Sequence, residues 1–390
     1  MPSASKDGSR IRTCSSYRSP SHRRMQIRPG CPHYNRRLEY RRMSRRSRKP
    51  DAYRVEAEGL LDRLTDGGSE LDRRLAADMI RTAVRLLDDG CDTGQMKMMT
   101  NALREMRSSW RVFADYKGIR KVSIYGSART PEDHVDYTAA RLFSRLMAEE
   151  SWMAITGAGD GIMKAGHEGP TRDASFGLRI RLPFETAANE VIEGDPKLIS
   201  FRYFFTRKVM FMAHADAVAV FPGGFGTQDE LFEALTLIQT GKSNLIPVVL
   251  MEGEGGVYWE HWMNYVEKNL GDNGWISPED YSLIHRASSP EDGCRHILDF
   301  YRVFHSKRYV GDHLVIRLRH RLSGEALDAL NDEFADLVHT GSIEQSDALP
   351  EESDHLELPR LVFHHHRRGW SRVRQLIDRI NESGGMAGDE

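Results

Sequence analysis

The 390-residue chain lacks the features of a membrane protein, a disulfide-stabilised fold or a metal centre. No apolar run approaches the roughly 20 residues that a membrane-spanning helix needs, so we expect no membrane partner. Four cysteines are scattered without disulfide or metal-ligand spacing, and the N-terminus has no apolar segment of the signal-peptide kind. We therefore expect a cytoplasmic protein that binds no metal.

Two common nucleotide motifs are also missing. No GxxxxGK[ST] sequence is present, so the sequence does not support a P-loop NTPase. The turn at 157–161, GAGDG, follows a predicted strand and opens a predicted helix but lacks the GxGxxG spacing of a dinucleotide site. The triplet His364-His365-His366 invites a metal interpretation, yet neighbouring residues of a strand point to opposite faces, and no partner has ligand spacing.

The small formal net charge of −2 hides a large asymmetry along the chain. Residues 1–50 hold thirteen arginines and two lysines against Asp7 and Glu39, a net +13, which leaves −15 for the remainder. Such a basic tail can bind nucleic acid or an anionic membrane, and its composition is typical of disorder. We favour a plainer interpretation, in which translation starts near Met43 and residues 1–42 are not translated. We accordingly expect no nucleic-acid partner.

Hydrophobic periodicity predicts an α/β fold for residues 118–304. Short apolar runs predict strands at 121–126, 153–156, 177–182, 217–221, 246–251 and 283–287. Amphipathic segments predict helices at 134–149, 161–169, 201–214, 227–239, 258–270 and 290–304. Strictly alternating strands and helices indicate a doubly wound, Rossmann-like parallel sheet, which binds ligands beyond the carboxyl ends of its strands.

Two smaller regions flank this central part. Residues 51–117 are predicted as three helices, of which the second and third carry apolar stripes that could cover the sheet or form a subunit interface. Residues 305–390 are predicted as a small α/β module that regulates or oligomerises the protein. Its predicted strands are 313–318 and 358–363, and its predicted helices are 323–339 and 370–380.

The stretch from Phe221 to Glu230, FPGGFGTQDE, joins an apolar strand to a helix through a glycine turn. Gly223, Gly224 and Gly226 let the backbone approach a ligand closely. The free amides and the positive dipole end of the following helix favour an anion. The stretch therefore predicts a phosphate cradle beside a candidate catalytic acid.

The same residues allow a purely structural interpretation. Thr227 to Glu230 fits a capping box, in which Thr227 caps the helix and Glu230 folds back to the Thr227 amide. Upstream, Arg207 and Lys208 interrupt an apolar segment, and a buried arginine needs an anionic partner because an unpaired charge is costly to bury. A surface salt bridge is the alternative for this pair.

Together the two motifs resemble the paired RK and PGGxGTxxE motifs of the LOG family, the cytokinin riboside 5′-monophosphate phosphoribohydrolases and related nucleotide nucleosidases. The resemblance extends over about residues 120–303 and begins at the segment 122–129, VSIYGSAR, which is similar to the family's first strand and its GS turn. It continues through the segment 157–163, where family members usually carry GGGxxGLM or GGGPGIM. Ala158 and Asp160 depart from that pattern, and an acid near a phosphate would repel it.

The resemblance implies hydrolysis of the N-glycosidic bond of a nucleoside 5′-monophosphate of the purine or cytokinin type, without a cofactor. Glu230 would stabilise the oxocarbenium-like state and activate water, while Arg207 would orient the substrate. The implied contacts to phosphate and nucleotide are Gly126, Ser127, Gly157, Gly159, Gly161, Lys208, Gly223, Gly224, Gly226 and Thr227. The resemblance also implies a homodimer or higher homo-oligomer, because the family's cleft commonly lies near a subunit interface.

The sequence also allows other functions. A protein of the same fold could hold a nucleotide or a phosphorylated cofactor as a non-catalytic sensor or carrier. Family members often carry the label lysine decarboxylase, but that reaction needs a Schiff-base lysine, and phosphate binding explains Lys208 better. Glu233, one turn beyond Glu230, is expected to be structural. Arg179 or Arg181 could reach the cleft or lie on an exposed sheet face.

Overall fold

A computed structural model describes residues 52–182 and 187–383. The basic segment 1–50, with the predicted start near Met43, lies outside the described residues. Contacts divide the chain into two units, residues 1–92 and 93–390. The predicted domain limits at 51, 118 and 305 stay a prediction.

The first unit contributes helices α2 (Ala52–Leu64) and α3 (Glu70–Asp88), which pack against each other. A capping box starts α3, because the Ser69 side chain accepts from the Asp72 amide while the Asp72 side chain accepts from the Ser69 amide. The apolar stripe predicted on this helix is largely exposed, with Leu71, Leu75 and Met79 all about half accessible. Among the described residues of this unit, 52–92, the stripe thus remains largely accessible.

The third predicted helix, α4 (Thr93–Ala114), belongs to the second unit and packs on α7 (Phe204–His214) and β4 (Leu198–Phe201). Its Glu105 carboxylate accepts a hydrogen bond from the Arg202 amide at 2.8 Å and from Thr206 Oγ1 at 2.7 Å. Glu105 thereby fixes the start of α7. The helix that carries Arg207 is thus anchored from outside the sheet.

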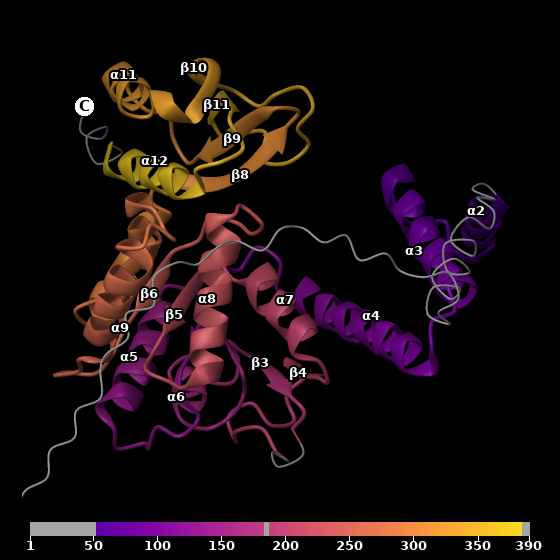
Figure 1. The fold of residues 1–390 in the computed structure, drawn as a ribbon, viewed down its shortest axis with the longest axis horizontal. Coiled ribbons are helices and arrows are strands. Elements are labelled where there is room, and N and C mark those ends of the chain that lie inside the picture. Colours follow the sequence, from indigo (N-terminus) through magenta and orange to yellow (C-terminus); the bar gives the residue numbers. More distant parts are fainter. Residues whose placement is uncertain (1–51, 183–186, 384–390) are drawn as a thin grey trace, which may run out of the picture. The chain divides into compact units, whose positions relative to one another are not determined.

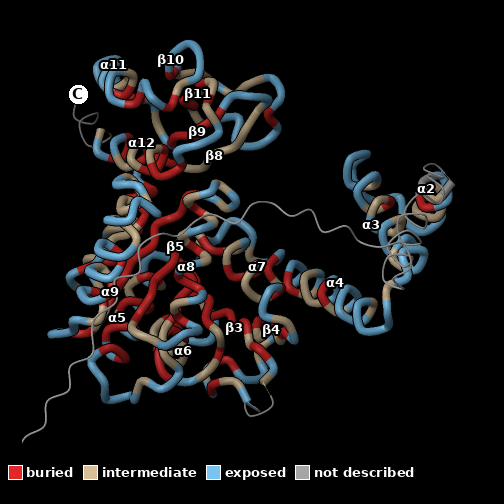
Figure 2. Tube along the Cα trace, viewed as in Figure 1, coloured by how far each residue is buried: buried red, intermediate tan, exposed pale blue. Residues whose placement is uncertain are grey.

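A seven-stranded parallel sheet forms the centre of this unit, in the order β4-β3-β2-β1-β5-β6-β7 (Figure 1). Its other strands are β1 (Lys121–Tyr125), β2 (Met153–Thr156), β3 (Ser175–Ile180), β5 (Ala217–Val220), β6 (Val248–Leu250) and β7 (Ile284–Arg286). The inner strands β1, β2, β5 and β6 are buried along their whole length, as their continuous apolar runs predicted. Figure 2 shows the buried centre of this sheet in red around β5. The predicted doubly wound, Rossmann-like fold is confirmed.

Helices cover both faces of the sheet. Ser123 of β1 donates to the Phe211 carbonyl of α7, while the next residue, Ile124, lies against Gly166 of α6 (Ile162–Glu168). Successive strand residues point to opposite faces, so α7 and α6 lie on opposite sides. The remaining helices of the layers are α5 (Val135–Glu149), α8 (Phe225–Gln239), α9 (Tyr258–Val266) and α10 (Pro290–Phe300), with a π-helical turn η1 (Glu267–Gly271) and a 3-10 turn η2 (Pro278–Leu283).

The C-terminal module contains a four-stranded antiparallel sheet, ordered β10-β11-β9-β8. Its elements are β8 (Phe304–Val310), β9 (His313–Leu318), α11 (Gly324–Glu333), the 3-10 turn η3 (Ala335–Leu337), β10 (Val338–Ser346), β11 (Arg360–His365) and α12 (Trp370–Ser383). Within it, Glu352 accepts from Arg317 Nη2 at 2.6 Å and from Arg360 Nε at 2.9 Å, a fully buried ionic cluster. The module joins the central sheet layers through α12, which contacts α8, α10 and η2.

The structure corrects several element predictions. β4 was missed, because the helix predicted from residue 201 starts at Phe204 instead. The helix predicted at 290–304 ends at Phe300, and β8 begins at Phe304. β8 and β10 were not predicted, since their residues are mostly polar and only partly buried.

Candidate functional site

A cavity of about 730 Å³ opens at the carboxyl ends of β1, β3 and β5. This is the topological switch point of the sheet, where the strand order runs outward in both directions from β1 and β5. The lining residues come from the three glycine turns, α6, α7, α8 and the ends of β1 and β3: Ile124, Tyr125, Gly126, Ser127, Ala128, Arg129, Gly157, Gly159, Met163, Ile180, Leu182, Phe204, Arg207, Phe211, Gly223, Gly224, Phe225, Gly226, Thr227, Gln228 and Glu230.

The PGG turn places the start of α8 in the wall of this cavity. The N-cap of α8 is Gly224, which has no side chain, so no side-chain hydrogen bond caps the start of this helix. The capping box considered for Thr227 and Glu230 is therefore wrong, because Thr227 is already the third residue of the helix. Gly223 is required for close packing, since a Cβ there would collide with Thr227 Oγ1 and lie 3.0 Å from the Ser127 amide. An uncapped helix start facing a cavity favours an anion.

Arg207 and Glu230 meet at the cavity wall. Arg207 Nη2 lies 3.2 Å from Glu230 Oε1, and both side chains are largely buried, with exposed fractions of 13% and 9%. The guanidinium also lies over the rings of Phe204 and Phe211. Burial raises the pKa of Glu230 to about 7, against the lowering by Arg207 and Lys208. A carboxylate that titrates near neutrality can accept a proton at physiological pH.

Lys208 lies outside the cavity lining, unlike its neighbour Arg207. Lys208 Nζ is 2.8 Å from Asp229 Oδ2 and 2.6 Å from Glu233 Oε2. Burial by itself would lower the pKa of Lys208, but hydrogen bonds to Asp229 and Glu233 raise it. A lysine held protonated between two carboxylates is poorly suited both to phosphate binding and to Schiff-base formation. Glu233, as expected, has a structural partner.

The other two glycine turns contribute unequally to the cavity. Gly126, Ser127, Gly157 and Gly159 line it, whereas Gly161 does not. Gly161 instead occupies the N-cap position of α6 with φ +58°, and a Cβ there would collide with the Ser127 carbonyl.

The residues that depart from the family pattern in this turn lie off the cavity. Asp160 is exposed and is not part of the lining, and Ala158 is fully buried. Asp160 would therefore not contact a phosphate bound in this cavity, and the repulsion expected from the sequence has no direct contact to act through.

A buried histidine, not predicted from the sequence, supports the second glycine turn. His167 Nε2 lies 2.9 Å from Thr156 Oγ1 and 3.0 Å from the Phe176 carbonyl, and its Nδ1 contacts the Asn189 side chain. Thr156 Oγ1 in turn accepts from the Ala158 amide at 3.0 Å, and Asn189 Nδ2 donates to the Gly159 carbonyl at 2.9 Å. Burial lowers the pKa of His167, which keeps it neutral. His167, Thr156 and Asn189 are far apart in the sequence, in a predicted helix, a predicted strand and a loop. No sequence pattern therefore indicated that they form a network.

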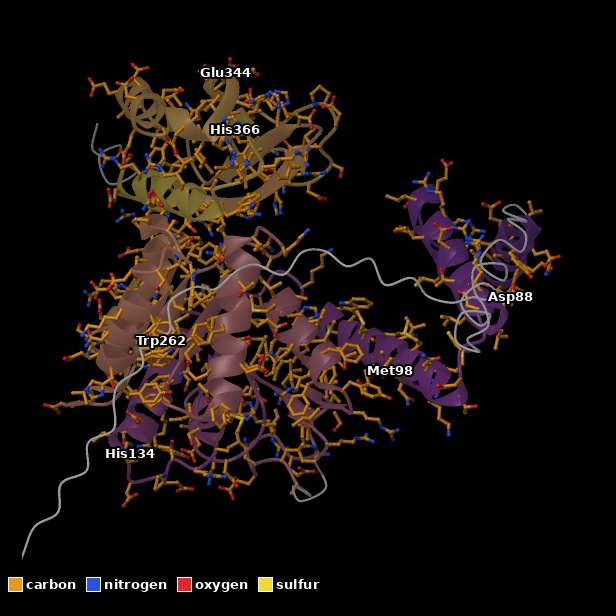
Figure 3. All side chains as sticks on the ribbon, in the orientation of Figure 1. Asp88, Met98, His134, Trp262, Glu344 and His366 are labelled. Atoms are coloured by element: carbon orange, nitrogen blue, oxygen red, sulfur yellow. The ribbon has the colours of Figure 1, made fainter. Side chains whose placement is uncertain are left out.

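A second group that was not predicted holds the PGG turn from α9. Tyr258 OH donates to the Gly223 carbonyl at 2.6 Å and lies 2.7 Å from Gln228 Nε2. Gln228 Oε1 accepts from Trp262 Nε1 at 2.8 Å, with Trp262 marked in Figure 3. The aromatic composition of α9, YWEHWMNYV, was the available signal. These contacts fix the turn without blocking its amides.

The remaining candidates from the sequence lie elsewhere. Arg179 is 3.7 Å from Glu193 and 3.3 Å from Ser200 Oγ, while Arg181 is exposed, and neither lines the cavity. His364 and His366 lie in the C-terminal module, where His366 is marked in Figure 3. Within residues 52–182 and 187–383, no group of three or more His, Cys, Asp or Glu side chains could hold a metal. No helix in that part of the chain is both long and apolar enough to cross a bilayer.

Known proteins resemble the region that builds this cavity. Residues 157–297 match the family model described as "Possible lysine decarboxylase". The chain is similar to two cytokinin riboside 5′-monophosphate phosphoribohydrolases of Arabidopsis thaliana, LOG1 at 33% identity over 94 residues and LOG3 at 25% over 178 residues. It spans 42% of the length of LOG1 and 79% of LOG3, using 24% and 44% of its own. The solved molybdenum cofactor binding protein of Rippkaea orientalis aligns over 47% of this chain and 96% of its own, at 21% identity and a TM-score of 0.33.

The strand order and the switch-point cavity define a Rossmann-like α/β protein. The matched family model and the similar curated proteins confirm the resemblance to the LOG family that the RK and PGGFGTQDE motifs indicated.

Proposed function

We propose that the protein hydrolyses the N-glycosidic bond of a nucleoside 5′-monophosphate, giving the free base and ribose 5-phosphate. One observation carries the proposal: a buried Glu230, paired with Arg207 at 3.2 Å, shares its cavity with the uncapped start of α8. A nucleotide offers the matching pair of features, a phosphate and, several ångströms away, a sugar carbon that becomes cationic. The similar proteins named above are phosphoribohydrolases, which supports the same reaction.

The reaction follows from the chemistry of these two side chains. Breaking the bond between C1′ and the base leaves its electron pair on the base nitrogen and positive charge on the ribose, which an ionised Glu230 stabilises. The oxygen of a water molecule attacks C1′, and Glu230 accepts the proton that this water loses. The departing base takes a proton from solvent. Arg207 keeps part of the Glu230 population ionised and aligns its carboxylate.

The phosphate-binding role is proposed for the amides of Gly224, Gly226 and Thr227 together with Gly126 and the Ser127 hydroxyl, all of which line the cavity. Gly157 and Gly159 face the same space. We do not extend the role to Lys208, because two carboxylates already hold its charge. The purine or cytokinin base, the homo-oligomeric state and the cytoplasmic location stay predictions.

The test is release of free base and ribose 5-phosphate from a panel of nucleoside 5′-monophosphates that includes a cytokinin nucleotide, with the full chain as enzyme. Glu230→Gln removes the charge at nearly constant volume, and Glu267→Gln makes the same change at an exposed position of η1, away from the cavity. We expect release by the wild type and by Glu267→Gln, and loss of release in Glu230→Gln. Nucleotide binding without release by the wild type would instead identify a non-catalytic nucleotide or phosphorylated-cofactor binding protein.

A further inference from the structure

A second arginine, Arg129, lines the cavity and has no assigned role. It is exposed, and no hydrogen bond or ion pair joins its guanidinium to any side chain or carbonyl in the described part of the chain. The other lining arginine, Arg207, is held by Glu230. Of the two arginines that line the cavity in the described part of the chain, Arg129 is therefore the one that is not paired with a carboxylate.

Three hydrogen bonds fix the loop that carries Arg129. The Ser127 amide donates to the Pro222 carbonyl at 3.1 Å, which ties the loop to the PGG turn. The Ile162 amide donates to the Ser127 carbonyl at 3.0 Å, and the Arg129 amide donates to Ser127 Oγ at 3.1 Å. The backbone at Arg129 is thus attached to the PGG turn and to the start of α6 before any ligand arrives, so ordering this backbone on binding costs little.

The charges of the cavity call for such a cation. An ionised Glu230 repels a phosphate dianion in the same cavity, and Arg207 is largely neutralised by that carboxylate. The helix start contributes only about half an elementary charge. A guanidinium can donate two parallel hydrogen bonds to a phosphate, and it keeps its charge at every pH of interest.

We propose that Arg129 is the specificity residue that recognises the phosphate of the substrate and makes the protein prefer nucleoside 5′-monophosphates to nucleosides. The proposal rests on the proposed function. It assigns Arg129 to the end of the substrate remote from the reacting carbon, whereas Glu230 and Arg207 act at C1′. Loss of Arg129 should consequently weaken binding of the substrate more than it slows the chemical step.

The experiment compares base release from one nucleoside 5′-monophosphate and from its nucleoside by wild type, Arg129→Ala, Arg129→Lys and Arg295→Ala. Arg295 is exposed on α10 and outside the cavity lining, so Arg295→Ala removes one positive charge elsewhere. For Arg129→Ala we expect kcat/KM for the nucleotide to fall roughly ten- to a hundredfold, mainly through KM, as loss of a charge-assisted hydrogen bond would cause. The value for the nucleoside should stay within about threefold, Arg129→Lys should retain part of the preference, and Arg295→Ala should match the wild type.

Equal losses for nucleotide and nucleoside, or no difference between Arg129→Ala and Arg295→Ala, would overturn the proposal. A calorimetric measurement of ribose 5-phosphate binding tests the role of Arg129 separately from the proposed hydrolysis. If the wild type binds ribose 5-phosphate but releases no base, the reaction is wrong, and a weaker affinity of Arg129→Ala still supports Arg129 as the phosphate contact. If Arg129→Ala binds ribose 5-phosphate as tightly as the wild type does, Arg129 is not that contact, whatever the activity.

Discussion

Replacing Glu230 by glutamine should stabilise the protein while it abolishes base release. Burial raises the pKa of Glu230 to about 7 from the ordinary value of 4.5. The folded protein therefore holds a proton that the unfolded chain has lost between these values, and the free energy of unfolding falls as the pH rises from 4.5 to 7. The difference in pKa corresponds to about 3 kcal/mol above pH 7. Glutamine resembles the protonated carboxyl and avoids that loss.

The assay is urea-induced unfolding of wild type, Glu230→Gln and Glu267→Gln at several pH values between 5 and 8. The stabilisation of Glu230→Gln over the wild type should be small at pH 5, grow through pH 6 and 7, and level off near pH 8. Glu267→Gln, on the exposed side of η1, should follow the wild type at every pH. Base release by the wild type should rise over the same pH range, because the ionised carboxylate is the active form. A Glu230→Gln variant that is no more stable than the wild type at pH 8 would refute this reasoning.

Three further predictions concern the surroundings of Glu230. Arg207→Gln removes a cation that lowers the pKa of Glu230, so the midpoint of the pH–rate profile should move to higher pH; an unchanged midpoint would separate the two residues. Gly223→Ala should lose most activity and some stability because its Cβ collides with Thr227, whereas Gly224→Ala, which has open space around the Cβ, should keep the fold, as circular dichroism and base release can show. Burial lowers the pKa of His167, so the free energy of unfolding of the wild type should fall as the pH drops below about 6.5. In urea unfolding at pH 8, His167→Gln should lower the free energy of unfolding by about 2–4 kcal/mol. On acidification, the free energy of unfolding should fall less for His167→Gln than for the wild type.

The sequence predicted the centre of the fold well because its strands are buried on both faces. Runs such as Ala217–Val220 have no polar residue, because helices cover both faces of a parallel sheet. A continuous apolar run therefore predicts a strand of such a sheet. The convergence of the Gly126, Gly157 and Gly223 turns followed from that topology, and all three glycines line one cavity. A strand at the edge of a sheet, such as β10, is harder to predict. In β10 most side chains are exposed or half-buried, so its residues carry little periodic signal, and the strand was missed.

The start of α8 shows where local sequence rules mislead. Thr227 and Glu230 have the spacing of a capping box, yet the helix begins at Phe225 after a Gly224 N-cap. The glycine turn, held by Tyr258 OH on the Gly223 carbonyl, determines the start, and the spacing of Thr227 becomes incidental. A helix that forgoes a good cap leaves amides free for a ligand, and such departures from local preference are expected at functional sites.

The adjacent cations of the RK motif acquire different partners through helical geometry. Successive residues of α7 point about 100° apart, so the side chains of Arg207 and Lys208 leave the helix in different directions. On α8 the same rotation separates Asp229 from Glu230. Lys208 consequently pairs with Asp229 and with Glu233, away from the cavity lining, and Arg207 is left with Glu230 on the cavity side.

This sorting explains how a buried carboxylate can titrate near neutrality beside two cations. Lys208 also lowers the pKa of Glu230, but it forms its ion pairs with other carboxylates, such as Glu233. Arg207 makes a single contact with Glu230, between Nη2 and Oε1 at 3.2 Å. If Lys208 donated directly to Glu230 as well, its charge would oppose the effect of burial and pull the pKa back toward the ordinary carboxyl range, where the carboxylate is a weaker base. The two cations of the motif therefore have separate roles: Lys208 joins α7 to α8 through Asp229 and Glu233, and Arg207 pairs with Glu230 at the cavity.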